Sequence, residues 1–281
     1  MLSKPQFERT RRLALRLAGI ELVERHRELL DRRSKRLGIC DSAGLDSLLT
    51  AVEQAEPSAR KQFLGLLTRK FTGFFRHRHH FELAAEHARC AALQRGRARL
   101  WSAAAATGEE PYSLAMTLIE VFESDTPPVN ILATDLDVEV LAVLQRGEYS
   151  ETALQALEVI RRNRFFTETE VARRWSIAPA VRRLVEFRAV NLASVPWEIE
   201  GPFDIIFCRN VLMYMEPGHR CAVLERMASL LAPDGLLMLD PAEHLGKAGH
   251  LFTPSAAGVY SLRRASLPRH EIRQAVTIPH L

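Results

Sequence analysis

The chain has 281 residues, of which 47% are hydrophobic and 26% charged, and a formal net charge of +4, as is typical of soluble globular proteins. No apolar run approaches the roughly 18 residues that a membrane-spanning helix requires, and the start of the chain lacks the apolar segment of a secretion signal. The four cysteines lack the CxxC spacing of a zinc ribbon, so we expect a reduced, cytoplasmic protein that does not insert into a membrane.

Residues 1–88 predict a small all-helical domain. Residues 89–98 are expected to link this domain to the next. Gly19 is expected to end the first helix. Phe7 lies off the apolar face of that helix. The apolar face consists of Leu13, Leu17 and Ile20. The inward face of a second helix, over residues 21–37, is expected to hold Leu22, Leu29, Leu30 and Leu37. Two more helices are expected over residues 44–54 and 59–70.

From residue 99 to residue 281 short apolar runs alternate with helical stretches, a pattern that indicates βαβ units and a mostly parallel sheet. The expected strands span residues 100–104, 130–134, 185–189, 204–208 and 236–239. The expected helices span residues 110–122, 138–145 and 219–231, the last followed by a turn at residues 233–235. Residues 251–254 and 258–262 predict a closing antiparallel hairpin, and the tail after Arg264 is expected to be loosely held. The fold class is therefore α/β, with a Rossmann-like domain after the helical one.

The first two βα units of this domain suggest a pocket for a nucleoside-type cofactor. Small residues follow the first expected strand, and such residues let a ligand lie against the backbone, although a tight packing turn would look the same. Asp135 ends the second strand, where it can accept hydrogen bonds from both ribose hydroxyls or cap the next helix, a role that Asp137 could take instead. Asn191 follows a third strand, where its side-chain amide could read an adenine edge.

Several motifs together resemble the CheR family, the chemotaxis-type methyltransferases that esterify glutamate side chains of chemoreceptors with S-adenosylmethionine. The resemblance covers nearly the whole chain. The stretches that carry it are Phe71–Arg76 with His79–Phe81, Trp101–Ser113, Ala133–Asp137, Arg146–Tyr149, Val190–Leu192, Phe207–Tyr214, Leu231–Leu236, Leu251–Phe252 and Gly258–Tyr260.

The resemblance implies S-adenosylmethionine as cofactor, S-adenosylhomocysteine as product, no metal, and a set of site residues. The residues implied to contact the cofactor are Thr72, Arg76, Ala103, Glu109, Asp135, Asn191, Leu192, Arg209 and Asn210. Among these, Ala103 and Glu109 would hold the methionine part, Asp135 the ribose, and Asn191 with Leu192 the adenine. The implied catalytic residues, which position the acceptor, are Arg76, Arg209 and Tyr214.

The charge is unevenly distributed along the chain. Residues 1–100 hold 21 Lys/Arg and 11 Asp/Glu, whereas the remaining residues hold 17 and 23. In view of the resemblance, we expect the basic second helix to contact the cytoplasmic helical domain of a chemoreceptor, although basic residues on an exposed helix face are commonly just solvated. The candidate contact residues are Arg25, Arg32, Arg33 and Arg36.

Two other functions compete with receptor methylation. A nucleic-acid methyltransferase commonly stacks the flipped base on an [Asp/Asn]-Pro-Pro-[Tyr/Phe] motif, but the corresponding strand end here reads Cys208-Arg-Asn-Val, so we expect no nucleic-acid partner. The other competitor is a cofactor-binding sensor or scaffold without turnover, because Lys70 stands where many family members have Asn and would be unfavourable beside a sulfonium.

Other departures from the family pattern concern the surroundings of the site. Ala106 replaces a usual Ser, His77 replaces an acid that commonly follows Arg76, and Asp240-Pro241 replaces a Gly-His pair. Some members bind a receptor's C-terminal pentapeptide with a glycine-containing β-subdomain. Residues 165–184 contain no glycine here and look partly helical, so we expect independence from the pentapeptide. His77, His79, His80 and His87 could suggest a metal site, but the resembling motif already explains two of these histidines as structural, so we expect no metal.

Overall fold

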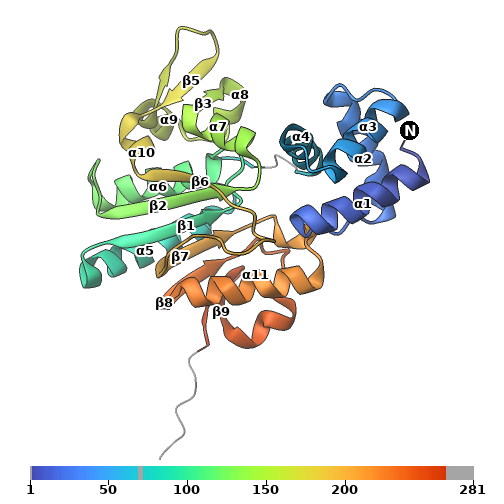
Figure 1. The fold of residues 1–281 in the computed structure, drawn as a ribbon. Coiled ribbons are helices and arrows are strands. Elements are labelled where there is room, and N and C mark those ends of the chain that lie inside the picture. Colours follow the sequence, from blue (N-terminus) through green and yellow to red (C-terminus); the bar gives the residue numbers. More distant parts are fainter. Residues whose placement is uncertain (1, 69–71, 264–281) are drawn as a thin grey trace, which may run out of the picture.

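The computed structural model describes residues 2–68 and 72–263 and has two parts, a bundle of short helices and a sheet covered by helices on both faces (Figure 1). Two expectations, the placement of Lys70 and the loosely held tail after Arg264, lie outside the described residues. The helices of the bundle are α1 (Lys4–Ala18), the 3-10 helix η1 (Glu24–His26), α2 (Arg27–Arg36), α3 (Ser42–Glu53) and α4 (Pro57–Leu67).

Residues at the two ends of α1 define where this first helix of the bundle starts and stops. Ser3 and Gln6 form a capping box at the start of α1, and Gly19 ends the helix in the left-handed conformation. Phe7 is only 1% exposed and belongs to the bundle core, because the apolar face of α1 is wider than three residues. Leu37 is 42% exposed, since α2 ends one residue before it, so its expected inward position was wrong.

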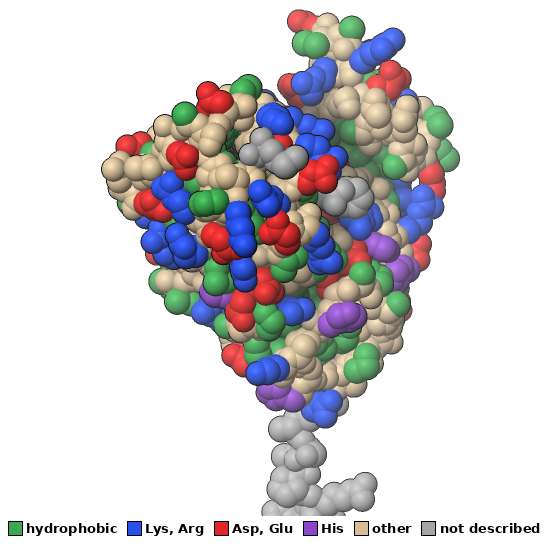
Figure 2. Space-filling view, turned by 90° about the vertical axis from the view of Figure 1, so that its right-hand side faces the viewer, with side chains coloured by type: hydrophobic (Ala, Val, Ile, Leu, Met, Phe, Trp, Pro, Cys, Tyr) green, Lys and Arg blue, Asp and Glu red, His purple; other side chains and the backbone are tan. Residues whose placement is uncertain are grey.

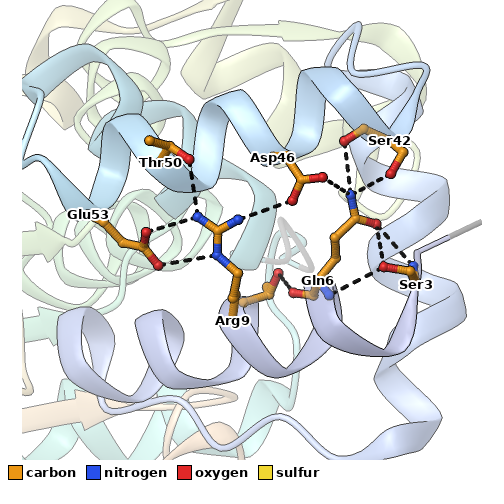
Figure 3. Close-up of polar contacts among 8 residues, drawn as sticks. Ser3, Gln6, Arg9, Ser42, Asp46, Thr50 and Glu53 are labelled. Carbon is orange, nitrogen blue, oxygen red and sulfur yellow. Dashed lines mark hydrogen bonds and ion pairs between the residues drawn. The ribbon is translucent and has the colours of Figure 1, made fainter.

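Polar side chains fix the seam between α1 and α3 (Figure 3). The Arg9 guanidinium donates to Asp46 at 3.1 Å and to Glu53 at 2.9 Å. Nearby, the buried Gln6 amide donates to the side chains of Ser42 at 2.7 Å and Asp46 at 2.9 Å. Exposed ion pairs of this kind contribute little free energy, but they select one register between the two helices.

Helix α5 (Arg78–Arg95) packs on the sheet and is not a linker. Its alanine face is buried in the same core as α6 (Glu109–Phe122) and the first strand. The helical bundle has a separate core, made of residues 2–67 with Leu136 packed against it. The connection between the two parts therefore falls near residues 68–77, and not at the expected residues 89–98. The charged, exposed side of α5 explains why it looked like a connecting segment.

The main sheet has seven strands in the order β6-β2-β1-β7-β8-β10-β9. The strands are β1 (Ala98–Ala103), β2 (Val129–Asp135), β6 (Val185–Ala189), β7 (Phe203–Cys208), β8 (Leu231–Met238), β9 (Phe252–Ala256) and β10 (Val259–Leu262). The first five of these pair in parallel, and β10 pairs antiparallel with both β8 and β9. The expected parallel sheet with its closing hairpin is confirmed, and β6 has the bounds that were expected.

Helices cover both faces of this sheet, as Figure 1 shows for α6 and α11. They are α6 (Glu109–Phe122), α7 (Val138–Arg146), α11 (Pro217–Leu230), η2 (Leu212–Tyr214) and η3 (Gly246–Leu251). The expected turn at residues 233–235 is a bulge inside β8, where the pairing with β7 shifts register. Strand β1 pairs with both β2 and β7. The chain moves outward from β1 to β2 and β6, then returns beside β1 with β7. Parallel sheets bind ligands at such a switch point, beyond the carboxyl ends of the strands.

Residues 148–183 form a small additional unit of strands and short helices. A three-stranded antiparallel sheet has the order β3-β5-β4. The elements are β3 (Glu148–Ser150), α8 (Glu151–Leu154), α9 (Val159–Phe165), β4 (Phe166–Glu168), β5 (Arg174–Ile177) and α10 (Pro179–Arg183). The partly helical interpretation of residues 165–184 was therefore incomplete, because strands of three or four residues leave too little alternation to recognise. Independence from a pentapeptide remains a prediction.

We predict that Gly108→Ala destabilises the protein more than Gly96→Ala does. Both glycines have positive φ, 99° and 76°, and an alanine there costs about 1–2 kcal/mol of backbone strain. A Cβ at Gly108 would also lie 2.5 Å from Leu144 Cγ, whereas one at Gly96 meets nothing within 4 Å. Overpacking adds about 1–3 kcal/mol. The free energy of unfolding in urea measures the difference, and equal losses would contradict the tight contact.

Candidate functional site

A cavity of about 270 Å³ opens beyond the carboxyl ends of β1, β2 and β7, between the sheet and the helical bundle. The structure brings eight of the predicted site residues together in its wall. They are Thr72, Arg76, Asp135, Asn191, Leu192, Arg209, Asn210 and Tyr214. These residues come from four separate stretches of the chain, so their convergence depends on the strand order.

Two predicted residues, Ala103 and Glu109, are not part of the cavity wall. Ala103 is fully buried within β1, and the wall is formed instead by Ala104 and Ala106 in the loop that follows. Both alanines have positive φ, of 69° and 46°, which is an uncommon backbone conformation for a residue with a Cβ. The loop therefore winds tightly and leaves room above the strand end.

Glu110 takes the place in the wall that was expected for Glu109. The Glu109 carboxylate accepts a hydrogen bond from the Thr107 hydroxyl at 2.7 Å, and burial raises its pKa. Neighbouring residues in a helix point in directions about 100° apart, so only Glu110 faces the cavity. Both glutamates stand in the sequence after Gly108, and the sequence offered no means of choosing between them.

Asp135 lies in the wall at the end of β2, as expected. Its carboxylate accepts from the backbone amide of Ala106 at 2.9 Å and from that of Asp137 at 3.0 Å. Burial raises its pKa, and these amides partly oppose the shift. Asp137 itself caps α7 by accepting from the amide of Glu139. Asp137, and not Asp135, is therefore the cap of α7, and the role of Asp135 toward a ribose stays a prediction.

The side chain of Asn191 joins the two parts of the molecule. Its amide nitrogen donates to the carbonyl of Leu17 at 2.7 Å, and its oxygen accepts from the amide of Ala193 at 3.0 Å. Both functional atoms thus already have partners in the protein. Each of these atoms can form a further hydrogen bond, so the reading of an adenine edge by Asn191 stays a prediction; Asn191 and Leu192 both line the cavity wall.

Arg209 is the buried centre of the wall, with a side chain only 2% exposed. Its guanidinium lies 3.2 Å from the Glu110 carboxylate and donates to the carbonyl of Arg76 at 2.6 Å. Glu110 also accepts from the Ser102 hydroxyl at 2.8 Å. Burial raises the pKa of Glu110, and the positive charge of Arg209 opposes that shift. Arg209 therefore holds the wall together, whereas the side chain of Arg76, 30% exposed, is the more accessible cation.

The helical bundle forms the opposite wall of the cavity. Leu22, Leu29, Leu30 and Leu67 line it. Two backbone hydrogen bonds fasten the bundle to the segment after β7, from Glu21 to the Tyr214 carbonyl and from Glu216 to the Gly19 carbonyl, both at 2.9 Å. Ile20 and Met215 form an antiparallel bridge between them. The helical domain was expected to contribute to the site through Thr72 and Arg76, but these wall leucines were not expected, because the contacts join residues almost 200 positions apart.

The four arginines predicted to contact a partner are not equivalent. Arg25, Arg32 and Arg36 are exposed on the bundle. Arg33 is turned inward and donates to the carbonyls of Leu66 at 3.1 Å and Leu67 at 2.7 Å, which end α4. It also lines the cavity, so it does not fit a role on an outer binding surface.

The surface of the bundle is mixed in charge. Viewed from the side of the bundle, Lys and Arg side chains alternate with Asp and Glu (Figure 2). Residues 1–68 hold 13 Lys/Arg and 9 Asp/Glu. More than half of the positive excess of the first 100 residues therefore belongs to residues 69–100, outside the bundle. The charge asymmetry that suggested a basic recognition domain is thus only partly a property of the bundle.

The histidines near the motif have structural contacts. The His80 ring lies 2.9 Å from the Ala257 carbonyl, and burial lowers its pKa to about 4. Within residues 2–68 and 72–263, no group of three or more His, Cys, Asp or Glu side chains is arranged to hold a metal ion. The same residues include no helix that is both long and apolar enough to span a membrane.

Comparison with known proteins identifies the family of the chain. Residues 70–260 match the family model described as "CheR methyltransferase, SAM binding domain". A "Chemotaxis protein methyltransferase 2" of Pseudomonas aeruginosa is 40% identical over 263 residues, 92% of this chain and 93% of the relative. A "Chemotaxis protein methyltransferase" of Escherichia coli is 36% identical over 274 residues, 94% of this chain and 92% of the relative.

We predict strong coupling between Arg209 and Glu110. Arg209→Met or Glu110→Met alone leaves a buried charge without its partner, which costs about 3–5 kcal/mol of unfolding free energy. The double variant should lose about 1–3 kcal/mol less than the sum of the single losses. Denaturant unfolding of the four proteins measures this cycle. Additive losses would show that the two side chains do not stabilise one another.

Proposed function

The chain belongs to the CheR family of S-adenosylmethionine-dependent methyltransferases, and we propose that it methylates glutamate side chains of a chemoreceptor. The products would be the glutamate methyl ester and S-adenosylhomocysteine. The observation that carries this proposal is the single cavity that joins Asp135 to Arg76. The Asp135 carboxylate suits the hydroxyl pair of a nucleoside, and the Arg76 guanidinium suits an anionic acceptor.

The residues present fit S-adenosylmethionine. Gly73, Ala104 and Ala106 in the wall leave room for a ligand close to the backbone, and a Cβ at Gly73 would meet nothing within 4 Å. Asp135 would hold the ribose hydroxyls, and Leu136, Val190 and Leu192 offer apolar surface for the base. Glu110 would face the positively charged methionine part, a role proposed here in place of Glu109.

S-adenosylmethionine supplies a methyl group already activated by its sulfonium charge, and a glutamate carboxylate is ionised at neutral pH. The protein therefore needs neither a metal nor a strong base, and its contribution is alignment in a site that excludes water. Arg76 would hold one oxygen of the acceptor carboxylate and leave the other free to react. Arg209 would act indirectly, because its contacts fix Glu110 and the backbone of Arg76.

The acceptor would approach from the side of the helical bundle. Tyr214 lines the cavity on the segment that is hydrogen-bonded to Glu21. Arg25, Arg32 and Arg36 are exposed there and could pair with acids of a cytoplasmic receptor helix. The mixed charge of the bundle favours an amphipathic protein partner over the uniformly anionic backbone of a nucleic acid. The protein would work in the cytoplasm, where such receptor domains lie.

We predict that the protein transfers radiolabelled methyl groups from S-adenosylmethionine to receptor-rich membranes, and that alkali releases the label. Carboxyl esters hydrolyse in base, whereas methylated amines do not. Membranes without receptors provide the control. Alkali-stable label, or label on RNA alone, would contradict glutamate methylation. Tight cofactor binding without transfer to any receptor would indicate a sensor or scaffold.

We predict that Asp135→Ala and Arg76→Ala impair different steps. Loss of the ribose contacts in Asp135→Ala should weaken cofactor binding about 10- to 100-fold, as measured by titration calorimetry. Arg76→Ala should lower kcat about 10-fold or more with a smaller change in cofactor affinity, and Arg76→Lys should recover only part of the loss. The exposed Asp125→Ala is the control and should change neither quantity. Unaltered affinity in Asp135→Ala would exclude its ribose role.

A further inference from the structure

Side chains from three segments of the chain converge on Asp240, which follows β8 at the edge of the cavity. One carboxylate oxygen, Oδ2, accepts a hydrogen bond from the Asn210 side-chain amide at 2.7 Å. The same oxygen lies 3.2 Å from His77 Nε2 and 3.4 Å from an Arg76 guanidinium nitrogen. Two of these residues, Arg76 and Asn210, line the cavity, whereas Asp240 itself does not.

Asp240 is well placed to act as a fixed anion. The residue is 5% exposed, and its second oxygen accepts from the backbone amide of Ala242 at 3.1 Å. Burial alone would raise the pKa of Asp240. The hydrogen bonds from Ala242 and Asn210 outweigh that effect and, with the positive charge of Arg76, hold the pKa below its ordinary value. The carboxylate therefore stays ionised at neutral pH.

The neighbouring Glu243 fixes the backbone of the same segment. Its carboxylate accepts from the backbone amides of Asn210 at 2.9 Å and Val211 at 3.0 Å, and from that of Asp240 at 3.0 Å. Asn210 has a φ of 60°, so these contacts support a backbone conformation that is otherwise uncommon. Glu243 thus holds the segment, and Asp240 is left to orient two side chains that face the cavity.

We propose that Asp240 is a positioning residue that orients the Arg76 guanidinium and the Asn210 amide toward the acceptor carboxylate. Because it is itself anionic and set behind the wall, it would not bind the acceptor. By sharing the charge of Arg76, it also keeps that cation from holding the acceptor so tightly that its oxygen becomes a poor nucleophile. This inference rests on the proposed function, since it concerns the acceptor side of that site.

His77 completes the cluster around Asp240. Its own pKa is lowered by burial and by Arg209, so the neutral ring can donate from Nε2 to Asp240. His77 and Asp240 are two positions where the sequence departs from the family pattern described above, and the structure brings these departures into contact at 3.2 Å. The two changes are thus complementary in charge and hydrogen bonding.

The test is a double-mutant cycle of Asp240→Asn with Arg76→Ala, read out as methyl transfer to receptor membranes. In the otherwise unchanged protein, Asp240→Asn should lower kcat about 10-fold and leave the cofactor Kd within about twofold. In the Arg76→Ala protein, where only the neutral Asn210 amide is left for Asp240 to orient, Asp240→Asn should cost much less. An equal loss in both backgrounds, or a fall in cofactor affinity as large as the fall in kcat, would overturn the proposal.

A matched control and a second measurement separate this inference from the proposed function. Asp234→Asn removes an exposed acid of β8 that pairs with Arg95 at the end of α5. Neither residue lines the cavity, so this change should leave transfer unchanged. Independently of any acceptor, the NMR signal of the Arg76 Nε–H should be sharp in the cofactor-bound protein and broadened by Asp240→Asn but not by Asp234→Asn. An unaffected signal would overturn the positioning role. Broadening in a protein that methylates no receptor would instead retain that role and refute the proposed function.

Discussion

The buried guanidinium of Arg209 is the contact on which the candidate site depends. It connects the end of β7 to the first turn of α6 through Glu110, and to the segment before α5 through the carbonyl of Arg76. These three segments belong to different parts of the sequence, and Arg209 joins them through side-chain contacts. A charge this deeply buried is stable only when its partners stay in place, so the geometry of the cavity wall and the stability of the domain are linked.

The charges around the cavity form two groups with different tasks. Glu110 and Asp135 lie on the β1 and β2 side, where a cationic cofactor would be favoured. Arg76 is linked to Glu110 through Arg209 and has Asp240 behind it, and it would favour an anionic acceptor. Charges of both signs in one cavity wall would allow two ligands of opposite charge to approach each other there. The contacts of Glu110, Asp135 and Asp240 thus explain why these acids stand in the C-terminal part, which its net charge alone does not.

The sequence predicted the sheet well and the details of the site less well. The buried strand β7 is a mostly apolar run and was found within one residue, and the edge strand β6, in which apolar and charged residues alternate, was found with its correct bounds. The short strands β3, β4 and β5 lack such runs and were missed. In the site, eight residues chosen from the motifs lie in one cavity wall. Two others were misplaced by one position, because Ala104 and Glu110 face the cavity where Ala103 and Glu109 were expected. The inward turn of Arg33 and the Asn191 contact with Leu17 depend on tertiary packing that no local pattern encodes.

The short bridge between Ile20 and Met215 has a consequence for how such proteins could diversify. The helical bundle and the segment that carries Tyr214 share backbone hydrogen bonds, and the bundle supplies one wall of the cavity. An exchange of bundles between relatives, whether by recombination or by design, would therefore have to preserve the surfaces around residues 19–21 and 214–216. The helical bundle and the methyltransferase domain can vary separately only where that seam remains compatible.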